Sequence, residues 1–159
     1  MGKRKPAVHI ENDGDKAVSC LFQSFRLARL IPGVQPWRRG GLKVAINSDH
    51  MLGLDPNKSL NPFNPFLAMY VAVTRRTESG RVIGSKQRVS REQALRMTTI
   101  DAAYLSFDEN KKGSIEVGKL GDLVVLSDDL LTCDAERVKD IQPVLTVVGG
   151  KVVHDVFSR

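Results

Sequence analysis

The pattern of apolar residues in this chain changes from helical to strand-like at about residue 113. Before that point, Asn64-Pro65 has the form of a helix start, with Asn as the cap and Pro as the first helical residue. Further along, residues 90–93 form a capping box, in which a Ser and a Gln side chain each accept the other residue's backbone N–H. These signals predict one helix over about 65–76 and a second over about 90–104.

The last third of the chain contains short apolar runs that have the composition of strands, separated by turns that contain glycine. Gly118-Lys119 and Gly149-Gly150 supply these turns, because glycine adopts the positive φ that tight hairpins need. A short helix is expected over 135–140. The expected strands lie at 42–46, 114–116, 122–126, 144–148 and 151–154. The pattern therefore predicts an α/β chain with a β-rich C-terminus.

The chain has 159 residues, whereas a complete (β/α)₈ barrel needs about 250. Its net charge is +6, but the basic residues are dispersed and no aromatic residues are interleaved with them as a base-stacking platform requires. We therefore expect no specific nucleic-acid partner. Cys20 and Cys133 stand alone and indicate reduced thiols in a cytoplasmic protein. The longest apolar run, 66–73, is much shorter than the about 20 residues of a membrane span, so no membrane partner is expected.

Four segments carry a resemblance to a known family. Residues 113–126, Gly-Ser-Ile-Glu-Val-Gly-Lys-Leu-Gly-Asp-Leu-Val-Val-Leu, resemble the signature of the small β-sandwich beside the barrel of metal-dependent amidohydrolases. Residues 41–49 resemble that family's last barrel strand, with its Gly-Ser-Asp-like end, and residues 72–77 resemble the helix that follows. Residues 141–154 resemble the closing strands. In this order and spacing, they make residues 41–159 similar to the C-terminal part of an amidohydrolase of family 3, in the N-acyl amide and N-substituted formamide deformylase branch.

This resemblance implies a partial (β/α) barrel end of the amidohydrolase type, followed by part of the flanking β-sandwich. Residues 1–112 would be the remnant of the barrel and residues 113–159 a portion of the composite sandwich domain. Residues 8–18 resemble the family's fifth-strand motif, with extra residues after His9, and residues 33–37 resemble the seventh strand. The sixth strand, which carries a further metal-binding His in the family, has no counterpart in this sequence.

The resemblance also implies Zn²⁺ or a similar divalent metal, and it transfers two ligand positions to this chain, His9 and Asp49. In the family, a metal-bound hydroxide attacks the amide carbonyl and the final-strand Asp shuttles the proton, so Asp49 is also the catalytic candidate. The alternative, that Asp49 only caps the loop after its strand, stays open. His50 has no family role, and His154 is expected at the surface. The family's His-x-His pair is missing and a catalytic zinc usually has three protein ligands, so we expect weak zinc binding or none, and no amidase turnover.

The sequence therefore predicts an amidohydrolase-family protein that is incomplete in this chain. If active, it would hydrolyse a non-peptide C–N bond of a small-molecule amide. The main alternative is a non-catalytic remnant or interaction module that forms a homo-oligomer, or binds a complementing chain, through apolar surfaces. A third interpretation is a basic protein that binds nucleic acid weakly and without sequence preference. A truncated gene product and a natural short protein both fit the sequence.

Overall fold

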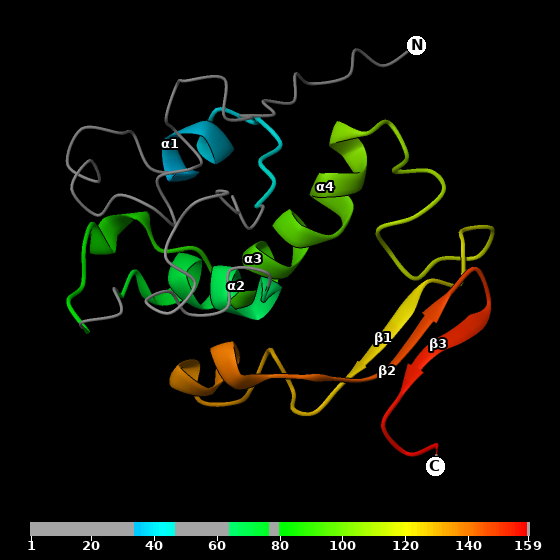
Figure 1. The fold of residues 1–159 in the computed structure, drawn as a ribbon. Helices are drawn as coiled ribbons and strands as arrows, with labels where there is room; N and C mark the ends of the chain where they lie inside the picture. The colour runs from blue at the N-terminus through cyan, green and yellow to red at the C-terminus, as the bar shows by residue number, and fades with distance from the viewer. Residues whose placement is uncertain (1–33, 47–63, 77–79, 159) are drawn as a thin grey trace, which may run out of the picture.

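The computed structural model describes residues 34–46, 64–76 and 80–158. In these residues the helices gather on one side and a three-stranded sheet extends from the other (Figure 1). The elements, in chain order, are α1 (Val34–Arg39), α2 (Pro65–Thr74), η2 (Ser85–Gln87), α3 (Arg91–Thr98), α4 (Ile100–Leu105), β1 (Leu123–Leu126), η3 (Ala135–Asp140), β2 (Pro143–Val148) and β3 (Lys151–Asp155). Within this part of the chain, no helix has both the length and the apolar character that a bilayer span requires.

Helix α2 lies at the centre of the helical part. The Asn64 side chain accepts the Phe66 N–H at 2.9 Å, so the predicted helix start is confirmed. All residues from 66 to 72 are buried, because a helix that is apolar on every side needs neighbours on every side. The helix ends where Arg75 takes a left-handed conformation with φ 58°, two residues before the predicted end.

The prediction of one helix over 90–104 is wrong at Thr99. The capping box itself is confirmed, with Ser90 Oγ accepting the Gln93 N–H at 3.1 Å and Gln93 Oε1 accepting the Ser90 N–H at 3.0 Å. At Thr99 the backbone leaves the helical region (φ −122°, ψ −95°), which separates α3 from α4. The hydroxyls of Thr98 and Thr99 both donate to the Leu95 carbonyl, at 2.9 and 2.8 Å. Such side-chain bonds compete with the helical backbone bonds and favour a break.

Two segments with a predicted strand character have other structures. Residues 33–37 resemble a strand, but α1 begins at Val34, and Pro36 is tolerated because the first turn needs no backbone N–H from it. Residues 42–46 contain one bridge residue, Lys43, and no strand. The Ile46 N–H instead donates to the Met97 carbonyl at the end of α3, at 3.1 Å. In the described residues this segment therefore contacts a helix end and has no neighbouring strand with which to form a ladder.

The sheet has the order β1-β2-β3, and both pairs of strands are antiparallel. These are the strands predicted at 122–126, 144–148 and 151–154, and all three are confirmed. Gly149 and Gly150 join β2 to β3 with φ of 57° and 76°, the conformation of a tight hairpin turn. The described residues contain no parallel pair of strands, so the barrel end stays a prediction.

The strand predicted at 114–116 is wrong, because these residues form a compact turn. Ser114 Oγ donates to Glu116 Oε1 at 2.6 Å, and Lys119 Nζ donates to the same carboxylate oxygen at 3.2 Å. Gly113, with φ 91°, begins this turn directly against α4. A Cβ on Gly113 would lie 2.8 Å from the Ala103 Cβ, so only glycine fits this approach.

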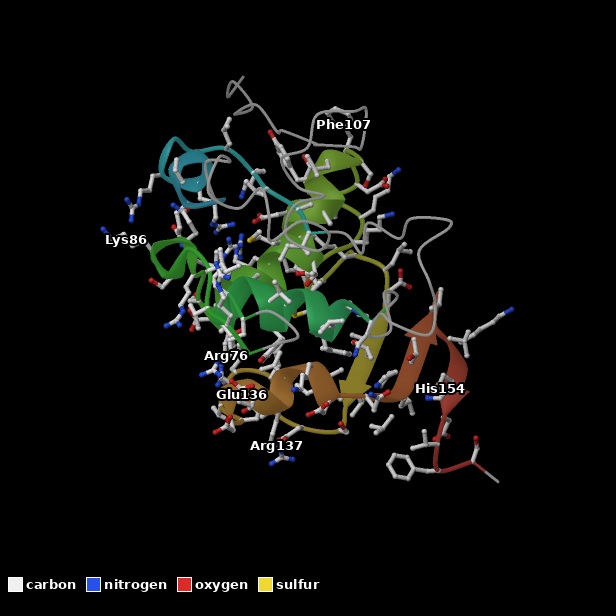
Figure 2. The ribbon with its side chains drawn as sticks, turned by 60° about the vertical axis from the view of Figure 1, so that its left-hand side comes forward. Arg76, Lys86, Phe107, Glu136, Arg137 and His154 are labelled. Carbon is white, nitrogen blue, oxygen red and sulfur yellow. The ribbon has the colours of Figure 1, made fainter. Side chains whose placement is uncertain are left out.

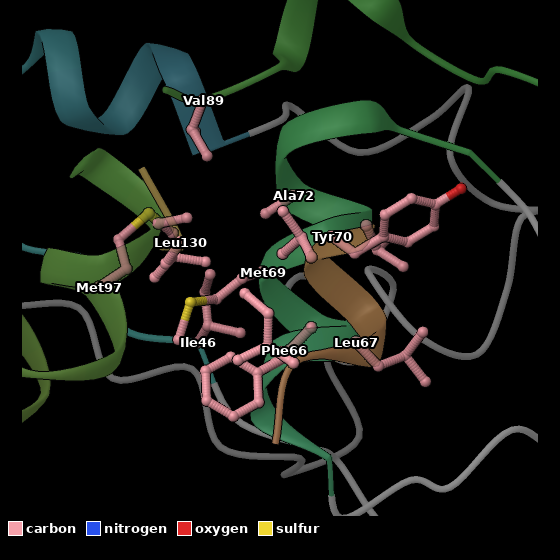
Figure 3. Close-up of a cluster of buried hydrophobic side chains, with 14 of the residues drawn as sticks. Ile46, Phe66, Leu67, Met69, Tyr70, Ala72, Val89, Met97 and Leu130 are labelled. Carbon is pink, nitrogen blue, oxygen red and sulfur yellow. The ribbon is translucent and has the colours of Figure 1, made fainter. Parts of the chain in front are cut away.

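The hydrophobic core surrounds α2 (Figure 3). Its other members come from the segment before α2, from α3, and from residues far along the chain: Val44, Ile46, Val89, Ala94, Met97, Leu130, Val138 and Ile141. Val138 and Ile141 reach the core from η3 and its C-cap. The short helix predicted over 135–140 is therefore confirmed, and it is a 3₁₀ helix. Cys133 packs against this core as a free thiol, and Cys20 lies outside the described residues.

Candidate functional site

The two predicted metal ligands, His9 and Asp49, lie outside the described residues, as does His50. The described residues contain no group of three or more His, Cys, Asp or Glu side chains that could hold a metal ion. They do not by themselves fit a catalytic zinc, which usually has three protein ligands. His154 is exposed on β3, where its Nε2 lies 3.2 Å from the Pro143 carbonyl (Figure 2), so its predicted surface position is confirmed.

The segment that leads toward Asp49 is held firmly at its described end. Val44 is 1% exposed and Ile46 is 7% exposed, and both belong to the core around α2. The backbone bond from Ile46 to Met97 also ties this segment to α3. Thus Val44 and Ile46, upstream of the predicted catalytic carboxylate, are fixed by packing and by a backbone hydrogen bond.

A polar cluster joins α2 to η3 beside the core. The Tyr70 hydroxyl donates to Glu136 Oε2 at 2.8 Å, and Arg76 Nε lies 3.2 Å from the other oxygen of that carboxylate. Figure 2 shows Arg76 directed toward Glu136. Burial raises the pKa of Tyr70 above its usual value of 10.0, and the hydrogen bond to Glu136 and the charge of that carboxylate raise it further. The phenol therefore stays protonated and acts as a hydrogen-bond donor that fastens η3 to α2.

A second polar cluster centres on Asp101, in the first turn of α4. This carboxylate is 1% exposed, and it bonds to Arg38 Nη1 at 3.2 Å and to Lys43 Nζ at 3.3 Å, one cation for each oxygen. A buried carboxylate is stable only when it is paired and hydrogen-bonded, and these two cations supply that pairing. Asp101 thereby ties α1 and the segment after it to the start of α4.

An open hollow of about 400 Å³ lies over this ion-pair cluster. Two further cations line it, Arg39 from α1 and Arg96 from α3, and both are exposed. Neither has an ion-pair partner among the residues that the structure describes. Among the described residues, four cations and one carboxylate line the hollow, so their summed charge is +3; these lining residues are Gln35, Arg38, Arg39, Gly41, Leu42, Lys43, Gln93, Arg96 and Asp101.

This cluster is not among the features predicted from the sequence, in which Arg38 and Arg39 belong to the dispersed surface charge. One signal was present in the sequence. Asp101 follows Ala94 and Met97 at helical spacing, on the face that the pattern directs inward. An acidic residue on a buried helix face requires a cationic partner, so Asp101 could have been predicted to pair.

The comparisons with known proteins define the class to which this fold belongs. The chain resembles the crystal structure of an amidohydrolase from Thermotoga maritima, with a TM-score of 0.51 and 19% sequence identity, over 74% of this chain and 24% of that one. This likeness shows the fold. Residues 15–154 match the Amidohydrolase family, and the chain therefore belongs to that family.

Two curated relatives support the same conclusion. The chain is 34% identical to the N-substituted formamide deformylase of Arthrobacter pascens over 115 residues, which are 72% of this chain and 20% of that protein. It is 29% identical to the imidazolonepropionase of Kosmotoga olearia over 153 residues, which are 92% of this chain and 35% of that protein. The chain thus spans between a fifth and about a third of the length of these relatives.

Proposed function

We propose that this chain is the C-terminal part of a metal-dependent amidohydrolase that hydrolyses a non-peptide C–N bond in a small-molecule amide. Residues 1–112 would contribute the end of the catalytic barrel, and residues 113–159 would contribute part of the composite sandwich. The family match over residues 15–154 supports this assignment, as does the similarity to a formamide deformylase. An N-substituted formamide is accordingly the substrate class we propose, acted on in the cytoplasm.

The observation that carries the proposal is the anchoring of the segment before Asp49. Ile46 is fixed in the core and bonded to α3, and Asp49 follows three residues later. Three residues of extended chain span at most about 11 Å, so the chain length alone limits how far the Asp49 backbone can lie from Ile46. We propose that Asp49 is a metal ligand and accepts a proton during hydrolysis.

His9 is the second proposed ligand. Because two ligands fall short of the three that usually hold a catalytic zinc, we propose that a complementing chain supplies the remaining ones. Such a chain would carry the His-x-His pair of the family. Without it, we expect the chain to bind zinc or a similar metal weakly and to show no turnover.

The test compares the chain alone with the chain mixed with a second polypeptide that carries the N-terminal part of the formamide deformylase relative. Metal content and hydrolysis of an N-substituted formamide are measured for the wild type, Asp49→Asn and Asp140→Asn. Asp140→Asn is the matched control, because Asp140 is an exposed carboxylate at the end of η3. We expect turnover only in the mixture, and its loss in Asp49→Asn but not in Asp140→Asn. Turnover that survives Asp49→Asn would refute the role of Asp49, and turnover by the chain alone would refute the need for a partner.

A second candidate function is that of an interaction module, and the exposed sheet favours it. Successive strand residues point to opposite faces, and Val124 and Val125 are 53% and 51% exposed, so both faces of β1 are open in the described part of the chain. Val152 and Val153 on β3 are also exposed. Large exposed apolar surfaces of this kind are typical of protein–protein contacts.

Light scattering at micromolar concentration tests this candidate. We expect oligomers for the wild type and a shift toward monomer for Val124→Lys/Val153→Lys. The matched control is Ser85→Lys/Asn110→Lys, which adds the same two lysines at exposed polar positions outside the sheet. A clean wild-type monomer would contradict the interaction module without affecting the catalytic proposal.

A further inference from the structure

We propose that the hollow beside α1 is a binding site for a small, multiply charged oxyanion of the phosphate class. It is built from three separate parts of the chain: α1, the segment 41–43, and the α3–α4 corner. The observation that leads to this proposal is that its four cations are of two kinds. Arg38 and Lys43 are paired with Asp101, whereas Arg39 and Arg96 have no ion-pair partner among the described residues.

Arg38 and Lys43 form the fixed floor of the hollow. The Asp101 carboxylate pairs with Arg38 Nη1 and with Lys43 Nζ. The Arg38 side chain is only 19% exposed. The Gln35 side chain also donates to the Arg88 carbonyl, which ties α1 to the residues before α3. The Arg38 and Lys43 side chains are therefore ordered before a ligand binds. The binding free energy of a ligand is then not reduced by the entropy lost when they become ordered.

Arg39 and Arg96 supply the recognition. Both guanidinium groups line the hollow, both are exposed, and within the described residues neither is committed to a carboxylate. A guanidinium presents its donors in a planar fork that matches the oxygens of a phosphate group. Two such groups from different helices can bind a ligand that carries more than one negative charge.

The size and lining of the hollow indicate a small molecule. Its volume of about 400 Å³ falls in the range of about 300–1,000 Å³ that is usual for small-molecule sites. No aromatic side chain is among its described lining residues, so it lacks the stacking surface on which nucleic-acid bases are bound. The charge of +3 on the described lining residues favours an oxyanion such as a diphosphate over a single carboxylate.

The described residues of this site are distinct from the two proposed metal ligands, His9 and Asp49. Gly41, Leu42 and Lys43 line the hollow at the amino end of the extended segment, whereas Asp49 follows the carboxyl end of that segment. An oxyanion bound here would bridge α1 and α3. The inference therefore does not depend on amide hydrolysis.

Isothermal titration of the full chain with inorganic pyrophosphate, at low and at physiological salt, tests the inference. We expect saturable binding with one site per chain, weakened at least tenfold in Arg39→Gln/Arg96→Gln, because each loses charge-assisted hydrogen bonds to the ligand. The matched control is Arg137→Gln/Lys151→Gln, which removes the same charge from η3 and β3. Circular dichroism verifies that both variants keep the wild-type fold.

Three outcomes would overturn the inference. Absence of saturable pyrophosphate binding excludes the site, and equal weakening in the control variant would show that net charge alone attracts the ion. Tighter binding of a single-stranded oligonucleotide, lost in Arg39→Gln/Arg96→Gln, would assign the hollow to nucleic acid instead. Retained pyrophosphate binding in Arg137→Gln/Lys151→Gln, together with its loss in Arg39→Gln/Arg96→Gln, supports the inference.

Discussion

The helical part around α2 and the sheet of β1–β3 differ in how far their apolar side chains are buried. Every residue from 66 to 72 in α2 is buried, whereas Val124, Val152 and Val153 in the sheet are more than half exposed. Both regions are rich in apolar residues, so apolar content alone does not distinguish them. The difference lies in their neighbours. Four separate segments cover α2, whereas in the described residues only Leu126, at the end of β1, joins the sheet to the core.

This contrast indicates which region is folded by its own contacts. The helical part satisfies its apolar surface within the described chain and should carry most of the stability, because burial of apolar area is the main favourable contribution to folding. The sheet keeps its hydrogen bonds but leaves most apolar side chains of β1 and β3 exposed in the described residues. A sheet of this kind gains stability when another polypeptide covers it.

Met97→Ala should give the largest loss of stability. Met97 is fully buried between α3 and the core, and truncation of such a side chain costs about 2–5 kcal/mol through lost contacts and a residual cavity. Urea unfolding followed by circular dichroism measures this change. A cost below about 1 kcal/mol would mean that α3 is not part of the core that folds around α2.

Gly113→Ala should be the next most damaging change, at about 2–4 kcal/mol, because positive φ and a backbone clash add together. Its new Cβ would lie 2.9 Å from the Ile100 Cα, which cannot move away as a flexible side chain can. Gly118→Ala is the matched control, since its φ of 90° is nearly the same but no atom lies within 4 Å of the added Cβ. Equal losses in the two variants would refute close packing between the turn and α4.

Tyr70→Phe should cost about 1 kcal/mol, because the lost hydrogen bond to Glu136 involves a carboxylate that is half exposed and partly screened. The raised pKa of Tyr70 adds a pH dependence. The folded protein keeps the phenolic proton more tightly than the unfolded chain, so this contribution is complete below pH 10.0 and is lost as the pH rises through the folded pKa. The free energy of unfolding should therefore fall more steeply above pH 10.0 in the wild type than in Tyr70→Phe; parallel curves would contradict this.

Val153→Ala should have the smallest effect, within about 0.5 kcal/mol, because its side chain is 62% exposed on β3. Repeating the measurement at increasing protein concentration sharpens the comparison. If the sheet is covered in an oligomer, the loss should grow with concentration; a large loss at low concentration would mean that the sheet is already covered within one chain.

The elements that could be predicted from sequence are those whose signals are local. The caps at Asn64 and Ser90 mark helix starts because one side chain satisfies a nearby backbone donor, and both positions are confirmed. The Gly149-Gly150 turn is confirmed for the same reason, since its conformation depends on two residues alone. The strands on either side of that turn then follow from the register of the hairpin.

One wrong prediction and one missed cluster depend on partners distant in the sequence. Residues 42–46 have the composition of a strand, but a strand needs a neighbour, and in the described residues Ile46 bonds to the end of α3. The Asp101 cluster was missed because its partners, Arg38 and Lys43, are 63 and 58 residues away. His9 and Asp49 remain predictions, since both lie outside the described residues.

The arrangement around α2 also has a consequence for biosynthesis. Helix α2 is complete at Thr74, but Val138 and Ile141, which close its core, are translated more than sixty residues later. At about 5–20 residues per second, a helix that is apolar on all sides stays partly uncovered for several seconds as the nascent chain grows. We therefore expect that the chain cannot complete its core on the ribosome until η3 has left the exit tunnel, and that ribosome-associated chaperones bind residues 66–72 until then.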